Sequence, residues 1–206
     1  VLSIVIAGAG RNLCGGADIR EFNTPARDVY PMTRDLMNLI EASDKPVVAA
    51  LRGPTLGGGL ELALGCHYRV AAADASLGMP EVLRGIVPGA GGTQRLPRLI
   101  GLVPALDMIT SGQPITASQA HELGLVDDLA AADPTGAAVL SGALAFADRL
   151  AAAGIGPRRI SEMSVPGDGD ENIATAIDYR VALEKSVRGV NAPLLCHAAV
   201  SLTLTE

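Results

Sequence analysis

Short runs of almost entirely apolar residues alternate along this chain with longer stretches in which apolar residues recur every three or four positions. Residues 1–7 and 47–51 are such runs, which predicts two strands buried on both faces of a parallel sheet. Thr24-Pro25 is typical of a helix start, and Lys45-Pro46 predicts where that helix ends. The helix between them is predicted from an apolar stripe that Pro31 interrupts early: Met32, Leu36, Leu39 and Ile40.

Helical spacing dominates the second half of the chain. A short helix is predicted for residues 93–98 after a glycine-rich loop, and Thr116 with Gln119 forms a capping box before a segment that Gly124 closes. A longer helix is predicted for residues 137–153, and a last long helix for residues 171–188. The segment 154–170 contains several prolines and glycines, so it is either a linker or a surface loop.

This alternation of strands and helices predicts an α/β fold, in which ligands bind beyond the carboxyl ends of the strands. We divide the chain into a core, residues 1–130, and a helical C-terminal region, residues 131–206. The sequence begins without methionine inside a predicted core strand. We therefore expect an N-terminal segment before Val1 to be missing.

Composition and charge exclude several classes of function. The 206 residues carry a net charge of −6, which argues against a nucleic-acid partner. No apolar run reaches about 18 residues, so no membrane span is expected. The three cysteines lack the spacing of a metal site, and we expect free thiols and no bound metal. His67 is interpreted as a packed histidine without a catalytic role.

A triple glycine followed by a glutamate, and a second glutamate after a short strand, are the strongest chemical signal. Residues 57–59 are glycines that lead into a predicted helix, where free backbone N–H groups and the helix dipole stabilise negative charge. Glu61 lies about one turn into this helix and should point back toward its start. Glu81 supplies a second carboxylate, so the pattern predicts an oxyanion hole with two acid/base groups.

Each of these residues also has a simpler structural explanation. The glycines could only permit close packing of helix on strand, and either glutamate could only stabilise a helix start. Gly8 and Gly10 do not begin a dinucleotide-binding motif, because its third glycine would fall at Leu13. The run 89–93 has no lysine after it, so it is predicted to shape the acid/base pocket and not to bind phosphate.

Four blocks of the sequence resemble the crotonase, or enoyl-CoA hydratase/isomerase, superfamily. They follow one another in the expected order and spacing, and residues 1–130 carry most of the resemblance: residues 13–22, 53–70, 77–98 and 115–125. Residues 56–72 and the later run 157–160 are most similar to the hydratase/isomerase part of multifunctional fatty-acid oxidation enzymes. The resemblance implies a crotonase-like ββα spiral core with a helical C-terminal part.

The resemblance also implies individual roles. Ala17 and Gly58 would supply the two oxyanion N–H groups, while Glu61 and Glu81 match both catalytic glutamates of the hydratases. The implied substrate- and coenzyme A-binding set adds residues of the loop before the first helix: Gly15 and Ala17 near the adenine end, Asp18, and Arg20 toward a phosphate, with Gly58 at the thioester.

The implied activity is hydration of a trans-2-enoyl-CoA to a 3-hydroxyacyl-CoA in fatty-acid β-oxidation, with double-bond isomerisation as a second activity. Another crotonase reaction, such as isomerisation, thioester hydrolysis or decarboxylation, or a non-catalytic truncated subunit, is the alternative. Coenzyme A enters as part of the substrate, and no separate cofactor is implied. The implied partners are an acyl-CoA thioester and either further copies of the chain or a fused or associated 3-hydroxyacyl-CoA dehydrogenase. The bacterial cytosol is the implied compartment, with the peroxisome as the alternative.

Overall fold

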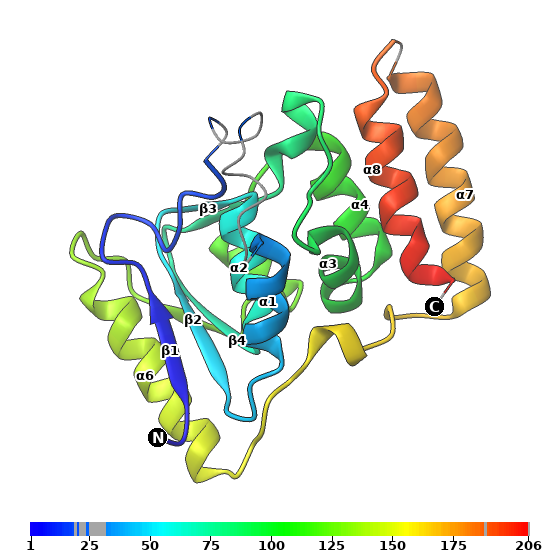
Figure 1. Cartoon of the computed structure of the whole chain (residues 1–206). Helices are drawn as coiled ribbons and strands as arrows, with labels where there is room; N and C mark the ends of the chain where they lie inside the picture. The colour runs from blue at the N-terminus through cyan, green and yellow to red at the C-terminus, as the bar shows by residue number, and fades with distance from the viewer. Residues whose placement is uncertain (19, 21–23, 25–31, 188, 206) are drawn as a thin grey trace.

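A computed structural model describes residues 1–18, 20, 24, 32–187 and 189–205 (Figure 1). Its larger sheet is parallel throughout and has the order β1-β2-β4-β7. The strands are β1 (Ile4–Ala7), β2 (Val47–Leu51), β4 (Tyr68–Ala72) and β7 (Asp128–Ala130). All five residues of β2 and of β4 are buried, which confirms the prediction of a fully covered strand at 47–51.

A smaller sheet stands beside the larger one and has the order β3-β5-β6. It consists of β3 (Pro54–Leu56), β5 (Ser76–Gly78) and β6 (Ile115–Thr116). The chain passes from β2 directly into β3, then through helix α2 (Gly58–Gly65), and repeats the two-strand step with β4 and β5. This succession of two strands and one helix confirms the predicted spiral core.

The first strand differs from its prediction. It is parallel to β2 as expected, but it covers only Ile4–Ala7, and the two residues at its ends are exposed. Val1 and Leu2, which were predicted to belong to the strand, are 91% and 76% exposed. The reason is position, because β1 lies at the edge of the sheet and pairs with one neighbour among the described strands.

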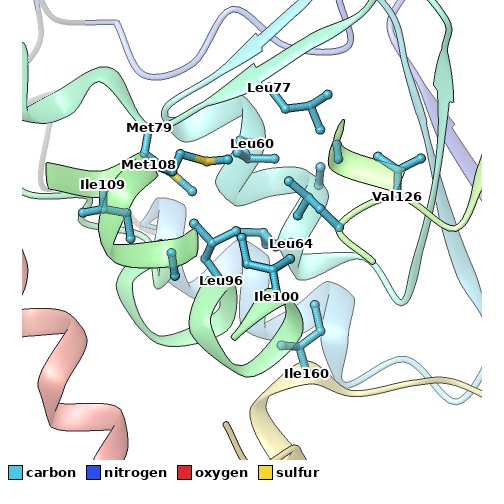
Figure 2. Packing of buried hydrophobic residues seen from close by; sticks show 14 of the residues in the cluster. Leu60, Leu64, Leu77, Met79, Leu96, Ile100, Met108, Ile109, Val126 and Ile160 are labelled. Carbon is cyan, nitrogen blue, oxygen red and sulfur yellow. The ribbon is translucent and has the colours of Figure 1, made fainter. Parts of the chain in front are cut away.

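Two hydrophobic clusters lie on opposite faces of the larger sheet. Helix α6 (Ala137–Ala152) covers one face and packs on β2 and β4 through Val139, Ala143, Ala147 and Leu150. The other cluster is larger and joins α2 to the helices that follow it. Figure 2 shows its packing, with these side chains labelled: Leu60, Leu64, Leu77, Met79, Leu96, Ile100, Met108, Ile109, Val126 and Ile160.

Most predicted helices form, with altered limits. Helix α1 (Thr33–Glu41) contains Leu36, Leu39 and Ile40 of the predicted stripe, but its buried residues are Met37 and Glu41, and Leu39 is 70% exposed. Pro25 and Pro31 lie outside the described residues. The expected short helix is α3 (Gly92–Ile100), followed by α4 (Leu102–Ser111). The capping box of Thr116 and Gln119 begins α5 (Ala117–Glu122). The described residues also form the short 3₁₀ helices η3 (Pro80–Arg84), η4 (Ile160–Glu162) and η5 (Leu202–Leu204).

The C-terminal end was predicted wrongly in one respect. Helix α7 (Gly169–Ser186) matches the predicted last long helix, but α8 (Ala192–Ser201) follows it. Gly189, with φ of 77°, and Pro193 in the first turn of α8 separate the two helices, which lie side by side in Figure 1. The pattern did not reveal α8 because apolar residues occupy most of its positions and leave no polar stripe.

The segment 154–170 runs over the surface but is anchored to the core. Ile160 is fully buried in the larger cluster. Arg158 forms an ion pair with Asp127 at 2.7 Å and lies 4.8 Å from the ring centroid of Tyr68. None of the described helices is long and apolar enough to cross a membrane.

Candidate active site

Each of the three glycines at the start of α2 is needed for a close approach. A Cβ added to Gly57, whose φ is 53°, would come within 2.9 Å of Glu81 Oε1. A Cβ on Gly58 would lie 3.1 Å from the backbone N of Ala17, and one on Gly59 would lie 2.6 Å from the carbonyl O of Cys14. The helix start therefore lies directly against the loop that carries Ala17 and against the second glutamate.

Glu61 lies in the first turn of α2 and is almost completely buried. Its Oε1 accepts two backbone hydrogen bonds, from Ala90 N–H at 2.7 Å and from Gly92 N–H at 2.9 Å. The loop at 89–93 thus holds this carboxylate at the cavity, as the sequence predicted for a loop that shapes the pocket. Burial raises the pKa of Glu61, while the two N–H groups and the positive charge of Arg95 oppose that rise.

Glu81 is placed by the smaller sheet. It follows β5 and Pro80 as the second residue of η3, and its carboxyl group lies over Gly57. Its Oε2 is buried and has no hydrogen-bond partner among the described residues. Burial raises the pKa of Glu81 to about 7, and the negative charge of Glu61 adds to the effect. Glu81 is therefore a carboxyl group that can both release and take up a proton near neutral pH.

A cavity of about 420 Å³ brings four of the predicted residues together. This volume lies within the range of small-molecule sites. The predicted residues that line it are Ala17, Gly58, Glu61 and Glu81. The remaining lining residues come from the start of α1 and from the loop between η3 and α3: Met32, Thr33, Arg34, Ile86, Val87, Gly89 and Ala90.

The other predicted binding residues lie beside this cavity. Gly15, Asp18 and Arg20 are exposed, and of the predicted loop residues Ala17 alone lines the described cavity. Arg20 is 88% exposed and forms a bidentate ion pair with Asp18, with a shortest distance of 2.6 Å. This contact lowers the pKa of the Asp18 carboxyl group.

Two features of the site were missed from sequence. Arg34 brings a positive charge to the cavity wall from α1, and it stands beside the apolar stripe that predicted that helix. The hydrogen bonds from Ala90 and Gly92 to Glu61 join residues about thirty positions apart. The Gly91-Gly92 pair was the only available signal, because glycines often mark a close backbone approach.

His67 is a packed histidine, as the sequence predicted. Both ring nitrogens of His67 are engaged, Nδ1 with Val47 N–H at 2.9 Å and Nε2 with the carbonyl O of Glu41 at 3.0 Å. All three cysteines are free thiols. Among the described residues, no group of three or more potential metal ligands comes together.

The buried Glu61 and the partly buried Glu81 line one cavity at the N-terminus of α2, on a spiral of paired strands and helices. This arrangement is a candidate acid/base site on a crotonase-type α/β fold. The family model described as enoyl-CoA hydratase/isomerase matches residues 1–192, and the chain belongs to this family.

Relatives of known sequence include multifunctional and single enzymes. The peroxisomal bifunctional enzyme of Danio rerio is 47% identical over 201 residues, which cover 97% of this chain and 27% of that protein. The probable enoyl-CoA hydratase of Bacillus subtilis is 50% identical over 131 residues, or 61% of this chain and 51% of that protein. The chain spans about a quarter of the length of the bifunctional relative.

Solved structures of the same fold include hydratases. An enoyl-CoA hydratase from Bacillus anthracis superposes with a TM-score of 0.64 at 32% identity and covers 98% of this chain and 72% of that one. A hydratase subunit from Geobacillus kaustophilus gives a TM-score of 0.64 at 30% identity over 100% of this chain and 73% of that one. These matches confirm the predicted fold class.

Proposed function

We propose that this chain is an enoyl-CoA hydratase that adds water to a trans-2-enoyl-CoA to give a 3-hydroxyacyl-CoA in fatty-acid β-oxidation. One observation carries the proposal. Glu61 and Glu81 line the same cavity as Gly58 and Ala17. The two carboxyl groups differ in their surroundings, because the loop before α3 donates two backbone hydrogen bonds to Glu61. The names of the relatives, bifunctional enzyme and enoyl-CoA hydratase, support the same activity.

The thioester carbonyl would bind at the start of α2. Its oxygen would accept hydrogen bonds from the backbone N–H groups of Ala17 and Gly58, with the helix dipole adding to the positive potential. Negative charge develops on that oxygen when a nucleophile adds at C3. Both N–H groups thus stabilise the enolate-like transition state more than the substrate.

The two glutamates would divide the proton transfers between them. Glu61 is assigned the role of the base that takes a proton from water: burial raises its pKa, but two N–H groups and Arg95 oppose that rise and favour its charged form. Glu81 is the better proton donor, because its pKa near 7 keeps a substantial fraction protonated at neutral pH. A water molecule held between them loses a proton to Glu61 as its oxygen bonds to C3, and Glu81 delivers a proton to C2.

Isomerisation of the double bond is proposed as a second activity on the strength of the same pKa. A carboxyl group whose pKa is about 7 can remove a proton from one carbon of an enoyl thioester and return it to another. The oxyanion donors stabilise the dienolate that exists between the two steps.

The proposal extends to the rest of the ligand and to its setting. Arg20 and Asp18, with the backbone at Gly15 and Ala17, are proposed to bind coenzyme A, which is part of the substrate, and no separate cofactor is proposed. We further propose association with other copies of the chain or with a 3-hydroxyacyl-CoA dehydrogenase. The bacterial cytosol is the proposed compartment, and the peroxisomal relatives make the peroxisome the alternative.

Turnover of crotonyl-CoA tests the activity. Hydration removes the conjugated double bond, so absorbance of the enoyl thioester should fall and 3-hydroxybutyryl-CoA should form. Release of free coenzyme A or carbon dioxide instead would identify thioester hydrolysis or decarboxylation. Absence of every product from folded protein would favour a non-catalytic subunit.

A further inference from the structure

A buried ion pair lies one contact away from Glu61. Arg95 in α3 and Glu41 at the end of α1 each have side chains that are 7% exposed. Arg95 Nε and Nη2 donate to Glu41 Oε2 at 3.1 and 2.7 Å, and Nη2 also donates to Asn38 Oδ1 at 2.8 Å. Glu41 Oε1 accepts from Ser161 N–H at 2.8 Å. Desolvation offsets most of the attraction in such a pair, so net stability alone is a weak reason for it.

The third guanidinium nitrogen of Arg95, Nη1, reaches the loop that holds Glu61. This nitrogen donates to the carbonyl O of Ala90 at 3.3 Å. The guanidinium also fills the space over Gly91, whose φ is 100° and where a Cβ would collide with Nη1. The N–H groups of Ala90 and Gly92 are the two donors to Glu61 Oε1. One short stretch of backbone is thus held by Arg95 and in turn holds Glu61.

The charges around Glu61 come from three elements. Arg95 in α3 lowers the pKa of Glu61 and so opposes the effect of burial. Glu81 in η3 is coupled to Glu61 by repulsion, and Arg34 in α1 lines the same cavity. Of the two arginines, Arg95 alone is bonded to the loop that bonds Glu61.

We propose that Arg95 is a positioning residue, in which the guanidinium, anchored by Glu41, fixes the backbone at 90–92 so that its N–H groups hold the Glu61 carboxylate toward the cavity. This role rests on the proposed hydratase function. Arg95 does not line the described cavity, so it acts through the loop and not on the substrate.

Three variants test this role. The double variant Glu41→Gln, Arg95→Met removes both charges and leaves no buried carboxylate unpaired. Arg95→Lys keeps the charge but loses the forked hydrogen bonds. Arg158→Met is the matched control, since Arg158 also forms an ion pair at 2.7 Å, but its hydrogen bonds go to Asp127 and to the carbonyl O of His67.

Amide hydrogen exchange at Ala90 and Gly92 reports on the loop directly. We expect exchange at both amides to become at least about tenfold faster in the double variant, to rise less in Arg95→Lys, and to stay unchanged in Arg158→Met. Exchange at wild-type rates in the folded double variant would overturn the role, whether or not the protein turns over crotonyl-CoA. Should the double variant not fold, unchanged exchange in Arg95→Lys would overturn it equally.

Kinetics with crotonyl-CoA give the second readout. The double variant should lose about 10- to 100-fold in kcat with KM within about threefold of wild type, because the ground-state contacts remain while the base is misplaced. The acidic limb of the kcat–pH profile of the double variant should move to higher pH, because the positive charge that favours ionised Glu61 is gone. In Arg95→Lys, which keeps that charge, the acidic limb should lie near its wild-type position. A wild-type protein that does not hydrate crotonyl-CoA would refute the proposed function, and the exchange data would still decide the role of Arg95.

Discussion

Glu61 and Glu81 carry the same carboxyl group in different surroundings. Glu61 accepts hydrogen bonds from two backbone N–H groups, whereas Glu81 Oε2 is buried and has no hydrogen-bond partner among the described residues. An amide side chain in either place keeps the size but cannot exchange a proton. We expect Glu61→Gln and Glu81→Gln each to lower kcat by about 10² to 10⁴ with a smaller change in KM, measured from the absorbance of crotonyl-CoA. Wild-type kcat in either folded variant would contradict the assignment.

The raised pKa of Glu81 also has a consequence for stability. The ordinary pKa of 4.5 rises to about 7 in the fold because burial disfavours the charge. The folded state therefore binds the proton more tightly than the unfolded state, and stability declines as pH rises from about 4.5 to about 7. Glutamine has no charge to bury. After allowance for partial exposure, Glu81→Gln should be more stable than wild type by on the order of 1 to 2 kcal/mol at pH 8 and by little at pH 4.

Urea unfolding at the two pH values measures this difference. Glu162→Gln is a suitable control, because the Glu162 side chain is 69% exposed and its replacement should alter stability equally at both. A stability gain for Glu81→Gln that is as large at pH 4 as at pH 8 would show that the charge is not its cause.

At the scale of elements, the junction of β3 and α2 brings the loop at 14–17 next to Glu61 and Glu81, the carboxylates proposed to be catalytic. A methyl group on Gly58 would lie 3.1 Å from Ala17 N, so Gly58→Ala must push apart the two backbone segments that carry the proposed oxyanion donors. We expect a loss of about 10² to 10³ in kcat with the helix retained by circular dichroism. Gly169→Ala is the matched control, because Gly169 also begins a helix and a Cβ there meets nothing within 4 Å. Similar activity in the two variants would place the oxyanion hole elsewhere.

Local sequence rules predicted the elements whose shape depends on nearby residues. The strand at 47–51 and the capping box at Thr116 required only their own side chains. The rules failed for elements whose extent depends on their position in the fold. Whether β1 is central or at an edge depends on its neighbours in space, and α8 is defined by packing on α4.

The site was predictable to a similar extent. Glu61 and Glu81 were found because they stand beside glycines and proline that mark turns. Arg34 and Arg95 were not found, because the positions of their side chains depend on how α1 and α3 pack against α2. A charged residue on a helix looks the same in sequence whether it faces solvent or a cavity.

At the scale of the whole molecule, Asp127 connects the segment 154–170 to the larger sheet through Arg158 and Arg69. It pairs with Arg158 at 2.7 Å and with Arg69 at 3.6 Å, and it accepts the Arg69 backbone N–H at 2.8 Å. Arg69 is completely buried, and burial lowers its pKa to about 10. Removal of the negative charge of Asp127 leaves the buried Arg69 cation without its ion-pair partner. We expect Asp127→Asn to reduce the free energy of unfolding by about 3 kcal/mol.

Denaturant unfolding with a parallel kcat measurement separates this effect from catalysis. The variant should keep kcat near the wild-type value under native conditions, because the pair stands outside the cavity. Replacement of the exposed Asp44, which lies 3.8 Å from Arg159, should change stability by less than about 1 kcal/mol. An equal effect of the two substitutions would mean that burial of Arg69 is unimportant.

The exposed edge made by β1 bears on how the protein behaves in concentrated solution. Its four residues, Ile4 to Ala7, include neither a charge nor a proline, which are the features that usually discourage one sheet from adding to another. Among the described strands the outer backbone groups of β1 have no neighbour, so they are a template for a further strand. Unless another polypeptide covers this edge, precipitation should begin there, and a lysine introduced in place of Ile4, which is 41% exposed, should delay it.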